Sequence, residues 1–150
     1  WLRPMDRWPI VLGAWLAAVT VSLPLTLVPL VASSIAVDGG SSLVGATAIA
    51  GTVGVLAYTA LFVLAGLLLK NAIVWGLGYV LIWEGIVAAF GSFAAKLAIR
   101  GYTRSILTSV TEVDLDLGDL SLGVGIVVPL IASVVALGLA SYRLRVMDVA

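Results

Sequence analysis

The sequence predicts an all-α membrane protein, a bundle of membrane-spanning helices. Hydrophobic residues make up 62% of the 150 residues and charged residues only 11%, whereas soluble domains contain about 45–50% apolar and about 25% charged residues. The mean hydropathy is +1.21. No residue from Trp8 to Val37 carries a charge, and about 20 predominantly apolar residues suffice to cross a bilayer. A water-soluble fold of this size could not bury so much apolar surface.

Four segments have the length and apolarity of spanning helices. They cover approximately residues 10–33, 43–69, 73–93 and 120–142. We expect Pro24 and Pro29 to kink the first helix, because proline lacks the backbone N–H that a helix interior uses. Membrane helices tolerate such kinks where neighbouring groups satisfy the freed carbonyls. Residues 1–150 therefore form one predicted transmembrane domain.

An amphipathic helix is predicted over residues 94–110. Lys96, Arg100 and Arg104 are spaced four apart, which places them on one helical face. We expect this helix to lie in, or dip into, the outer membrane interface. Its basic face either meets phosphate headgroups or forms a rim that guides an anionic lipid or substrate out of the membrane.

The lysines and arginines predict the orientation. If the chain has four spans, five basic residues lie on one side of the membrane: Arg3, Arg7, Lys70, Arg143 and Arg145. The other three lie on the opposite side: Lys96, Arg100 and Arg104. Basic residues accumulate on the cytoplasmic side of membrane proteins. We therefore expect a multi-pass protein of the plasma membrane, with both ends of the chain in the cytoplasm.

Glu84 is the only charge inside a predicted span. Acids within a membrane are costly and suggest function by default. Two interpretations follow: a hydrogen-bonded or neutral carboxylate near the outer interface, or part of a gate or substrate path.

Small residues recur every four positions in the second predicted span. Ala46, Ala50 and Gly54 form one such series, and Thr47 and Gly51 form another. Faces of this kind let helix backbones approach closely. They indicate packing within the bundle or, alternatively, a dimer interface.

Several classes of chemistry are excluded. The chain has no cysteine and no histidine, which removes disulfides, thiol catalysis and the commonest zinc ligands. It has no phosphate-binding loop, no nucleophile elbow and no H-E-x-x-H motif. The acids after Glu112 resemble a calcium loop, but Gly118 and Gly125 replace two ligands. We therefore predict no catalytic residue, no metal and no cofactor; the net charge of zero gives no argument for nucleic acid.

The opening segment "LRPMDRWPIVLGAWLA" resembles the cytoplasmic loop of type-2 ATP-binding-cassette exporter permeases. The later segment "KLAIRGYTRSIL", which follows "YVLIWEG", is also similar to these permeases, particularly to actinobacterial-type members. The resemblance covers nearly the whole chain. It implies that the four predicted helices are the third to sixth of six spans, so that this fragment lacks the first two.

The resemblance also implies functional residues. The opening segment would be a coupling helix that docks on an ATPase, with Arg3, Asp6 and Arg7 as its polar face, Pro4 as a breaker and Trp8 as a headgroup anchor. Alternatively, the two arginines only fix the topology beside anionic lipid. A second set would form a substrate path or outer gate and comprises Glu84, Lys96, Arg100 and Arg104.

The function implied is that of a permease subunit in an ATP-driven exporter. The ATPase activity would reside in a separate ATP-binding-cassette subunit, so this chain would not itself be an enzyme. Its other partners would be a second permease copy and the lipid bilayer, but not nucleic acid. One alternative is a non-transporting assembly or anchoring protein of the membrane. An ion-coupled secondary transporter is another, although it would need more intramembrane charge than Glu84 supplies, and inverted repeats.

Overall fold

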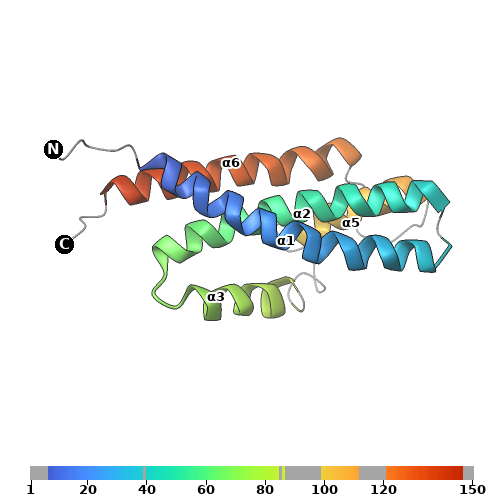
Figure 1. Cartoon of the computed structure of the whole chain (residues 1–150), viewed down its shortest axis with the longest axis horizontal. Coiled ribbons are helices and arrows are strands. Elements are labelled where there is room, and N and C mark those ends of the chain that lie inside the picture. The colour runs from blue at the N-terminus through green and yellow to red at the C-terminus, as the bar shows by residue number, and fades with distance from the viewer. Residues whose placement is uncertain (1–6, 39, 85, 87–98, 112–120, 147–150) are drawn as a thin grey trace.

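The computed structural model describes residues 7–38, 40–84, 86, 99–111 and 121–146, without the side chains of residues 83, 84, 100 and 109–111. All regular structure in this part of the chain is helical (Figure 1). Three helices are long and apolar enough to cross a membrane. The prediction of an all-α protein is confirmed, and these helices are compatible with a multi-pass membrane protein.

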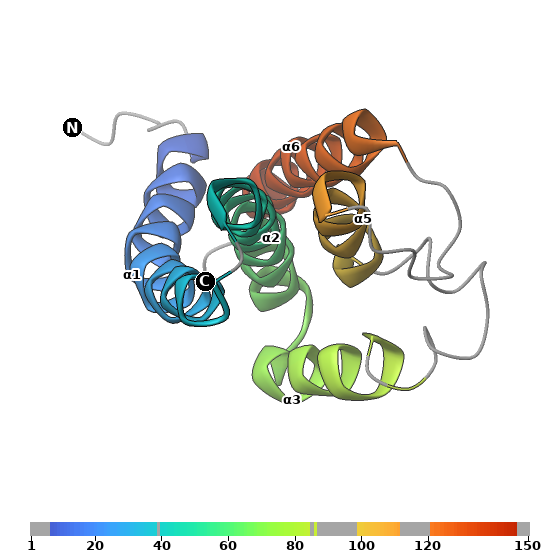
Figure 2. The ribbon, with the colours of Figure 1, turned by 90° about the vertical axis from the view of Figure 1, so that its right-hand side faces the viewer.

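The first of these, α1 (Trp8–Ala36), extends slightly beyond the predicted residues 10–33 at both ends. Pro9 lies in its first turn, where the missing N–H would have no partner in the helix. Pro24 and Pro29 lie inside the helix, and α1 bends along its length without being interrupted (Figure 2). This bend is the expected consequence of removing two backbone donors.

A tight turn connects α1 to α2 (Gly40–Leu68). The amide of Asp38 donates to the carbonyl oxygen of Ile35 at 3.0 Å. Asp38 and Gly40 adopt positive φ angles of 56° and 67°, which aspartate tolerates better than most residues and glycine adopts freely. The two helices therefore run antiparallel, and the turn lies at one end of the molecule (Figure 1).

Helix α3 (Ala72–Gly78) starts the predicted span 73–93 and continues as a π-helix, η1 (Tyr79–Glu84). The apolar part of this segment, Ala72–Ile82, is shorter than the three spanning helices. Residues 87–93 lie outside the described part of the chain. Three spans are therefore established as candidates by the structure, and the fourth stays a prediction.

Helix α5 (Ile99–Thr111) covers the described part of the predicted amphipathic helix 94–110. It runs antiparallel to α2. Its Thr103 lies beside Gly54, at a distance of 3.3 Å from where a β-carbon would be. One turn later, Ile106 packs on Ala50, which is nearer the start of α2. The helix therefore lies along the spanning helices and reaches the middle of α2.

The last helix, α6 (Leu122–Val146), packs against α2 and α5. It starts within two residues of the predicted span 120–142 and continues past its predicted end. Gly125 makes the close approach to α5 possible. A β-carbon at this position would lie 2.6 Å from Ser105 Oγ and 3.1 Å from the carbonyl oxygen of Tyr102.

Helix α2 is the centre of the bundle, with α1 on one side and α5 and α6 on the other (Figure 2). The buried residues are mainly small, as expected where helices approach closely in a membrane. Those with 5% exposure or less include Ala46, Ala50, Val53, Ala57, Ala60, Ser133, Ala136 and Ala140. The small-residue face of α2 thus faces inward within one chain, which supports packing within the bundle.

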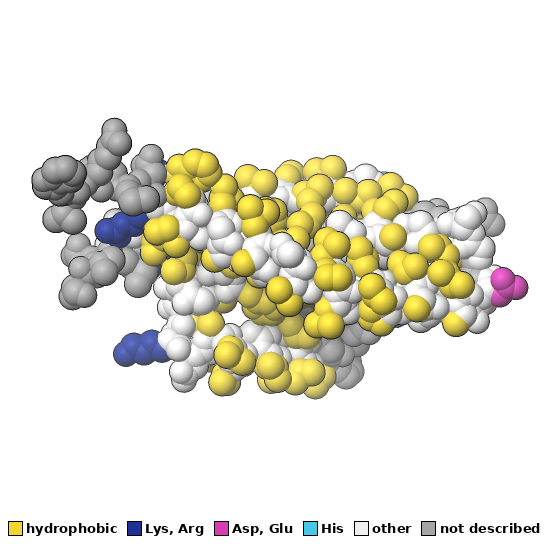
Figure 3. All heavy atoms as spheres, in the orientation of Figure 1, with side chains coloured by type: hydrophobic (Ala, Val, Ile, Leu, Met, Phe, Trp, Pro, Cys, Tyr) yellow, Lys and Arg dark blue, Asp and Glu magenta, His cyan; other side chains and the backbone are white. Residues whose placement is uncertain are grey.

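Hydrophobic side chains cover much of the face of the bundle that Figure 3 shows. Leu25 of α1, Ile73 of α3 and Val134 of α6 are exposed by 75%, 81% and 71%. Water would disfavour so continuous an apolar surface, whereas lipid tails solvate it as well as protein does. The exposed side chains therefore agree with a bilayer environment.

Candidate functional site

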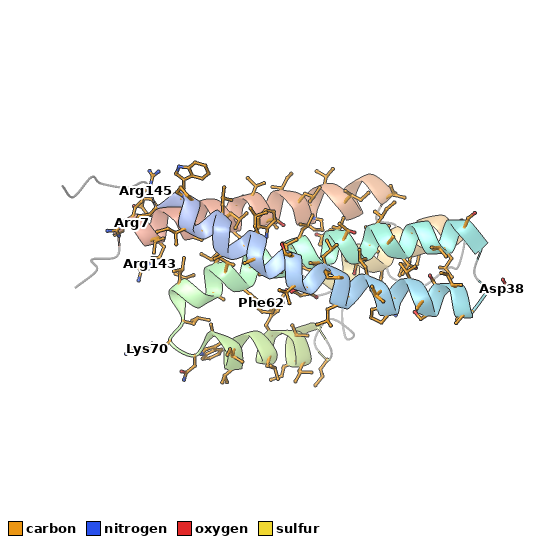
Figure 4. The ribbon with its side chains drawn as sticks, viewed as in Figure 1. Arg7, Asp38, Phe62, Lys70, Arg143 and Arg145 are labelled. Carbon is orange, nitrogen blue, oxygen red and sulfur yellow. The ribbon has the colours of Figure 1, made fainter. Side chains whose placement is uncertain are left out.

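Basic side chains gather at one end of the bundle. Arg7 precedes α1, Lys70 lies between α2 and α3, and Arg143 and Arg145 lie in the last turn of α6; Asp38 lies at the opposite end (Figures 3 and 4). The structure thus brings together four of the five residues that the sequence places on one side. That this side is cytoplasmic stays a prediction.

Arg7 ties the start of α1 to the end of α6. Its Nη1 donates a hydrogen bond to the carbonyl oxygen of Leu144 at 2.6 Å. Carbonyls in the last turn of a helix have no intrahelical donor, and a cation there also interacts favourably with the helix dipole. The guanidinium therefore stabilises the end of α6 and joins two spanning helices.

The other predicted coupling residues are only partly described. Trp8, the first residue of α1, is 47% exposed at the basic end. Arg3, Pro4 and Asp6 lie outside the described residues, so their predicted role is untouched by the structure.

The predicted outer group is also only partly described. Glu84 ends η1 and Arg100 lies in α5, but their side chains lie outside the described residues, as does the whole of Lys96. Arg104 is half-buried on α5. It follows Thr103, which lies beside the middle of α2.

A groove of about 390 Å³ lies between α1, α2 and α5. It is not one of the sites predicted from the sequence. Six of its lining residues carry hydroxyl groups, and the rest are apolar or glycine. The hydroxyl-bearing residues are Ser22, Thr26, Thr47, Tyr58, Thr59 and Thr103.

Small residues of α2 form the floor of this groove. A β-carbon on Gly51 would lie 2.8 Å from Leu27 Cδ2 of α1, so the two helices are already in close contact there. Thr47 and Gly51 were grouped by their spacing alone. Ser22 and Thr26 have the same four-residue spacing on α1. This spacing was the sequence pattern that could have indicated the α1 side of the groove. Both pairs line the same groove because of how α1 packs on α2.

The hydroxyl groups deep in the spanning helices differ in their hydrogen bonds. Many donate back to a carbonyl oxygen of their own helix at 2.7–2.8 Å, as serine and threonine do in apolar surroundings; they include Thr20, Ser33, Ser34, Thr52, Thr59, Ser133 and Ser141. Ser22, Thr26 and Thr47 form no such bond, and no other described residue is their hydrogen-bond partner. All three line the groove.

A second cavity of about 450 Å³ lies between α2 and α3. Phe62 of α2 projects toward α3 in Figure 4, and Gly76 accommodates its ring. Apart from Gly76, the lining consists of apolar side chains. This cavity offers only dispersion contacts, whereas the groove offers hydrogen bonds as well.

Comparison with known proteins gives no relative. No protein family, no curated protein and no solved structure matches this chain. Within the described residues there is also no group of three or more side chains that could hold a metal ion.

Proposed function

We propose that this chain is a membrane-spanning permease subunit of an ATP-driven exporter of the ATP-binding-cassette class. The resemblance of its opening segment and of "KLAIRGYTRSIL" to such permeases supports the assignment. The observation that carries the proposal is the basic end of the bundle, where the opening segment enters α1 beside the end of α6. A partner that docks there contacts two spanning helices at once.

Arg7 gives this end a mechanical role. Because its guanidinium holds the last turn of α6, a displacement of the opening segment moves α1 and α6 together. Arg3, Pro4, Asp6 and Trp8 provide the docking surface for the ATPase subunit. The chain itself hydrolyses no ATP, and a second permease copy completes the translocation path.

A path for substrate that starts near the middle of the bundle is the second part of the proposal. In the proposed orientation the basic end is cytoplasmic and Asp38 faces outward in the plasma membrane. Arg104 then lies at membrane depth on α5, where charged side chains are costly and generally functional. Together with Glu84, Lys96 and Arg100 it forms the proposed exit path.

Two matched charge reversals test the docking end. Asp6→Lys changes the proposed docking surface and leaves Arg7 bonded to Leu144, and Asp38→Lys makes the same change at the opposite end. The full-length protein is purified from its native membrane, and the ATP hydrolysis that co-purifies is measured. We expect activity with the wild type and with Asp38→Lys, and a loss of at least about tenfold with Asp6→Lys, equivalent to about 1.4 kcal/mol of binding.

The other outcomes favour the alternatives. If no ATP hydrolysis co-purifies with the wild type, the exporter assignment is wrong and an assembly or anchoring protein is favoured. If transport follows an ion gradient without ATP, the protein is a secondary transporter. Equal losses in both variants would show that the opening segment is not the docking surface.

A further inference from the structure

The groove between α1, α2 and α5 lies deep in the bundle. Ser22 is at the middle of α1, and Thr26 is one turn further, at about 6 Å along the axis. Thr47 lies about 10 Å from Gly54, the middle of α2. These distances are below half of the hydrocarbon thickness of about 30 Å. The three hydroxyl groups are therefore at the depth of the lipid tails.

An unbonded hydroxyl group at this depth is unfavourable. Without water, a polar group that lacks a hydrogen bond costs about 1–3 kcal/mol, and a serine or threonine in a helix can avoid this by donating to the carbonyl four residues earlier. Thr52, one helical turn beyond Ala48 on α2, does so at 2.7 Å. Thr47 does not, although only 9% of it is exposed. Its hydroxyl group is available to a molecule in the groove.

The walls of the groove restrict what this molecule can be. None of the lining residues is charged, and an unpaired ionic group at membrane depth would be expensive. Leu30, Val55 and Phe62 supply apolar surface along the groove. The volume of about 390 Å³ is within the range of small-molecule sites, about 300–1,000 Å³.

We propose that this groove binds an uncharged amphiphile from the membrane. Its hydroxyl or carbonyl group hydrogen-bonds to one of the hydroxyl groups that line the groove without a bond of their own, those of Ser22, Thr26 and Thr47. Its apolar body lies along Leu30, Val55 and Phe62. The site is contained in one chain and does not depend on an ATPase. The test of this site is therefore independent of the test of the proposed exporter function.

The test compares two photoreactive probes of equal length, a long-chain alcohol and the corresponding alkane, each with a diazirine. They are added to the full-length protein in lipid vesicles and activated by light. The groove variant is Ser22→Ala, Thr26→Val and Thr47→Val combined. The control variant is Thr20→Val with Thr52→Val, because those hydroxyl groups bond to their own helix and do not line the groove.

We expect the wild type and the control variant to incorporate the alcohol in preference to the alkane. In the groove variant the ratio of alcohol to alkane incorporation should fall by about fivefold or more, the factor that one neutral hydrogen bond contributes. Incorporation of the alkane itself should equal that of the wild type. The proposal is overturned if the wild type shows no preference, in which case only lipid tails or water occupy the groove. It is also overturned if the control variant loses the preference to the same extent.

A second measurement needs no variant and so does not depend on how well the groove variant folds. Peptide mapping of the labelled wild type locates the attached alcohol. We expect attachment within the lining of the groove on α1, α2 or α5, and excess unlabelled alcohol should suppress it whereas excess alkane should not. Attachment confined to α3, or spread over the lipid-facing surface, would refute the proposal.

Discussion

The seam between α2, α5 and α6 differs sharply from the contact between α2 and α3. In the seam, Ile106 is fully buried and Gly125 lies against the backbone of α5. By contrast, α3 stands apart from the rest of the bundle (Figure 2), and Ile73 and Trp75 are exposed by 81% and 66%. A cavity of about 450 Å³ separates α3 from α2.

Hydrophobicity does not explain this difference, because both regions are strongly apolar. Lipid tails solvate an apolar side chain as well as another helix does, so close packing decides which helices associate. The seam places Gly54, Gly125 and Ala50 between its helices. Helix α3 contributes Gly76 to its contact with Phe62, but bulky side chains elsewhere. Small residues therefore determine which part of this bundle is closely packed.

The largest effect is expected from filling the closest approach in the seam. Gly125→Val places side-chain atoms where Ser105 Oγ and the carbonyl oxygen of Tyr102 already lie, and overpacking of this kind costs about 3 kcal/mol. Thermal unfolding in lipid nanodiscs measures the loss. The matched control is Gly138→Val in the same helix, since a β-carbon there meets nothing within 4 Å. Equal losses in both variants would contradict the close approach.

A smaller loss is expected from emptying the seam. Ile106→Ala leaves a cavity beside Ala50 and Val53, and we expect a cost of about 2 kcal/mol from lost packing. Ile73→Ala makes the same change on the exposed face of α3 and should cost less than about 0.5 kcal/mol. Chemical denaturation of both variants checks the difference. If the two substitutions cost the same, the contrast between the regions is wrong.

A substitution in the contact between α3 and α2 should have a smaller but still measurable effect on stability. Gly76→Ala puts a β-carbon 2.8 Å from Phe62 Cε1, and because the ring can shift toward the cavity we expect a cost of about 1 kcal/mol. Gly78→Ala is the control, since its β-carbon would meet nothing within 4 Å. Protease susceptibility of the link between α2 and α3, together with unfolding, reports on the displacement. If neither protease susceptibility nor unfolding changes, α3 already moves freely on Phe62.

The smallest effect on stability is expected at Trp75. Trp75→Phe should change the free energy of unfolding by less than about 0.5 kcal/mol, because the side chain is 66% exposed. It should, however, remove a large share of the fluorescence that brominated lipids quench. Trp15→Phe is the comparison, since Trp15 is partly buried and its indole donates to the carbonyl oxygen of Leu56 on α2 at 3.4 Å. If Trp15→Phe removes more of the quenched fluorescence than Trp75→Phe, Trp15 and not Trp75 is the side chain that faces lipid.

The helical class, three of the four predicted spans and the grouping of basic residues at one end could be predicted from the sequence alone. Hydropathy suffices for the spans, because a backbone in hydrocarbon must satisfy its own hydrogen bonds and a long apolar segment can do so only as a helix. The positions of Arg7, Lys70, Arg143 and Arg145 follow from the number and direction of the helices. The structure of segment 73–93 could not be predicted in the same way, because apolarity alone does not determine where an α-helix ends and the π-helix η1 begins.

Which small residues meet, and where the polar groups face, could not be predicted before the packing of the helices was known. Gly125 against Tyr102, and Gly51 against Leu27, are pairs of residues distant in sequence. No local pattern specifies such pairs, because in lipid the driving force is the fit between two helix surfaces and not the apolarity of either one. Arg7 illustrates the same limit. Its charge predicted the side of the membrane, but its bond to Leu144 depends on α6 ending beside α1.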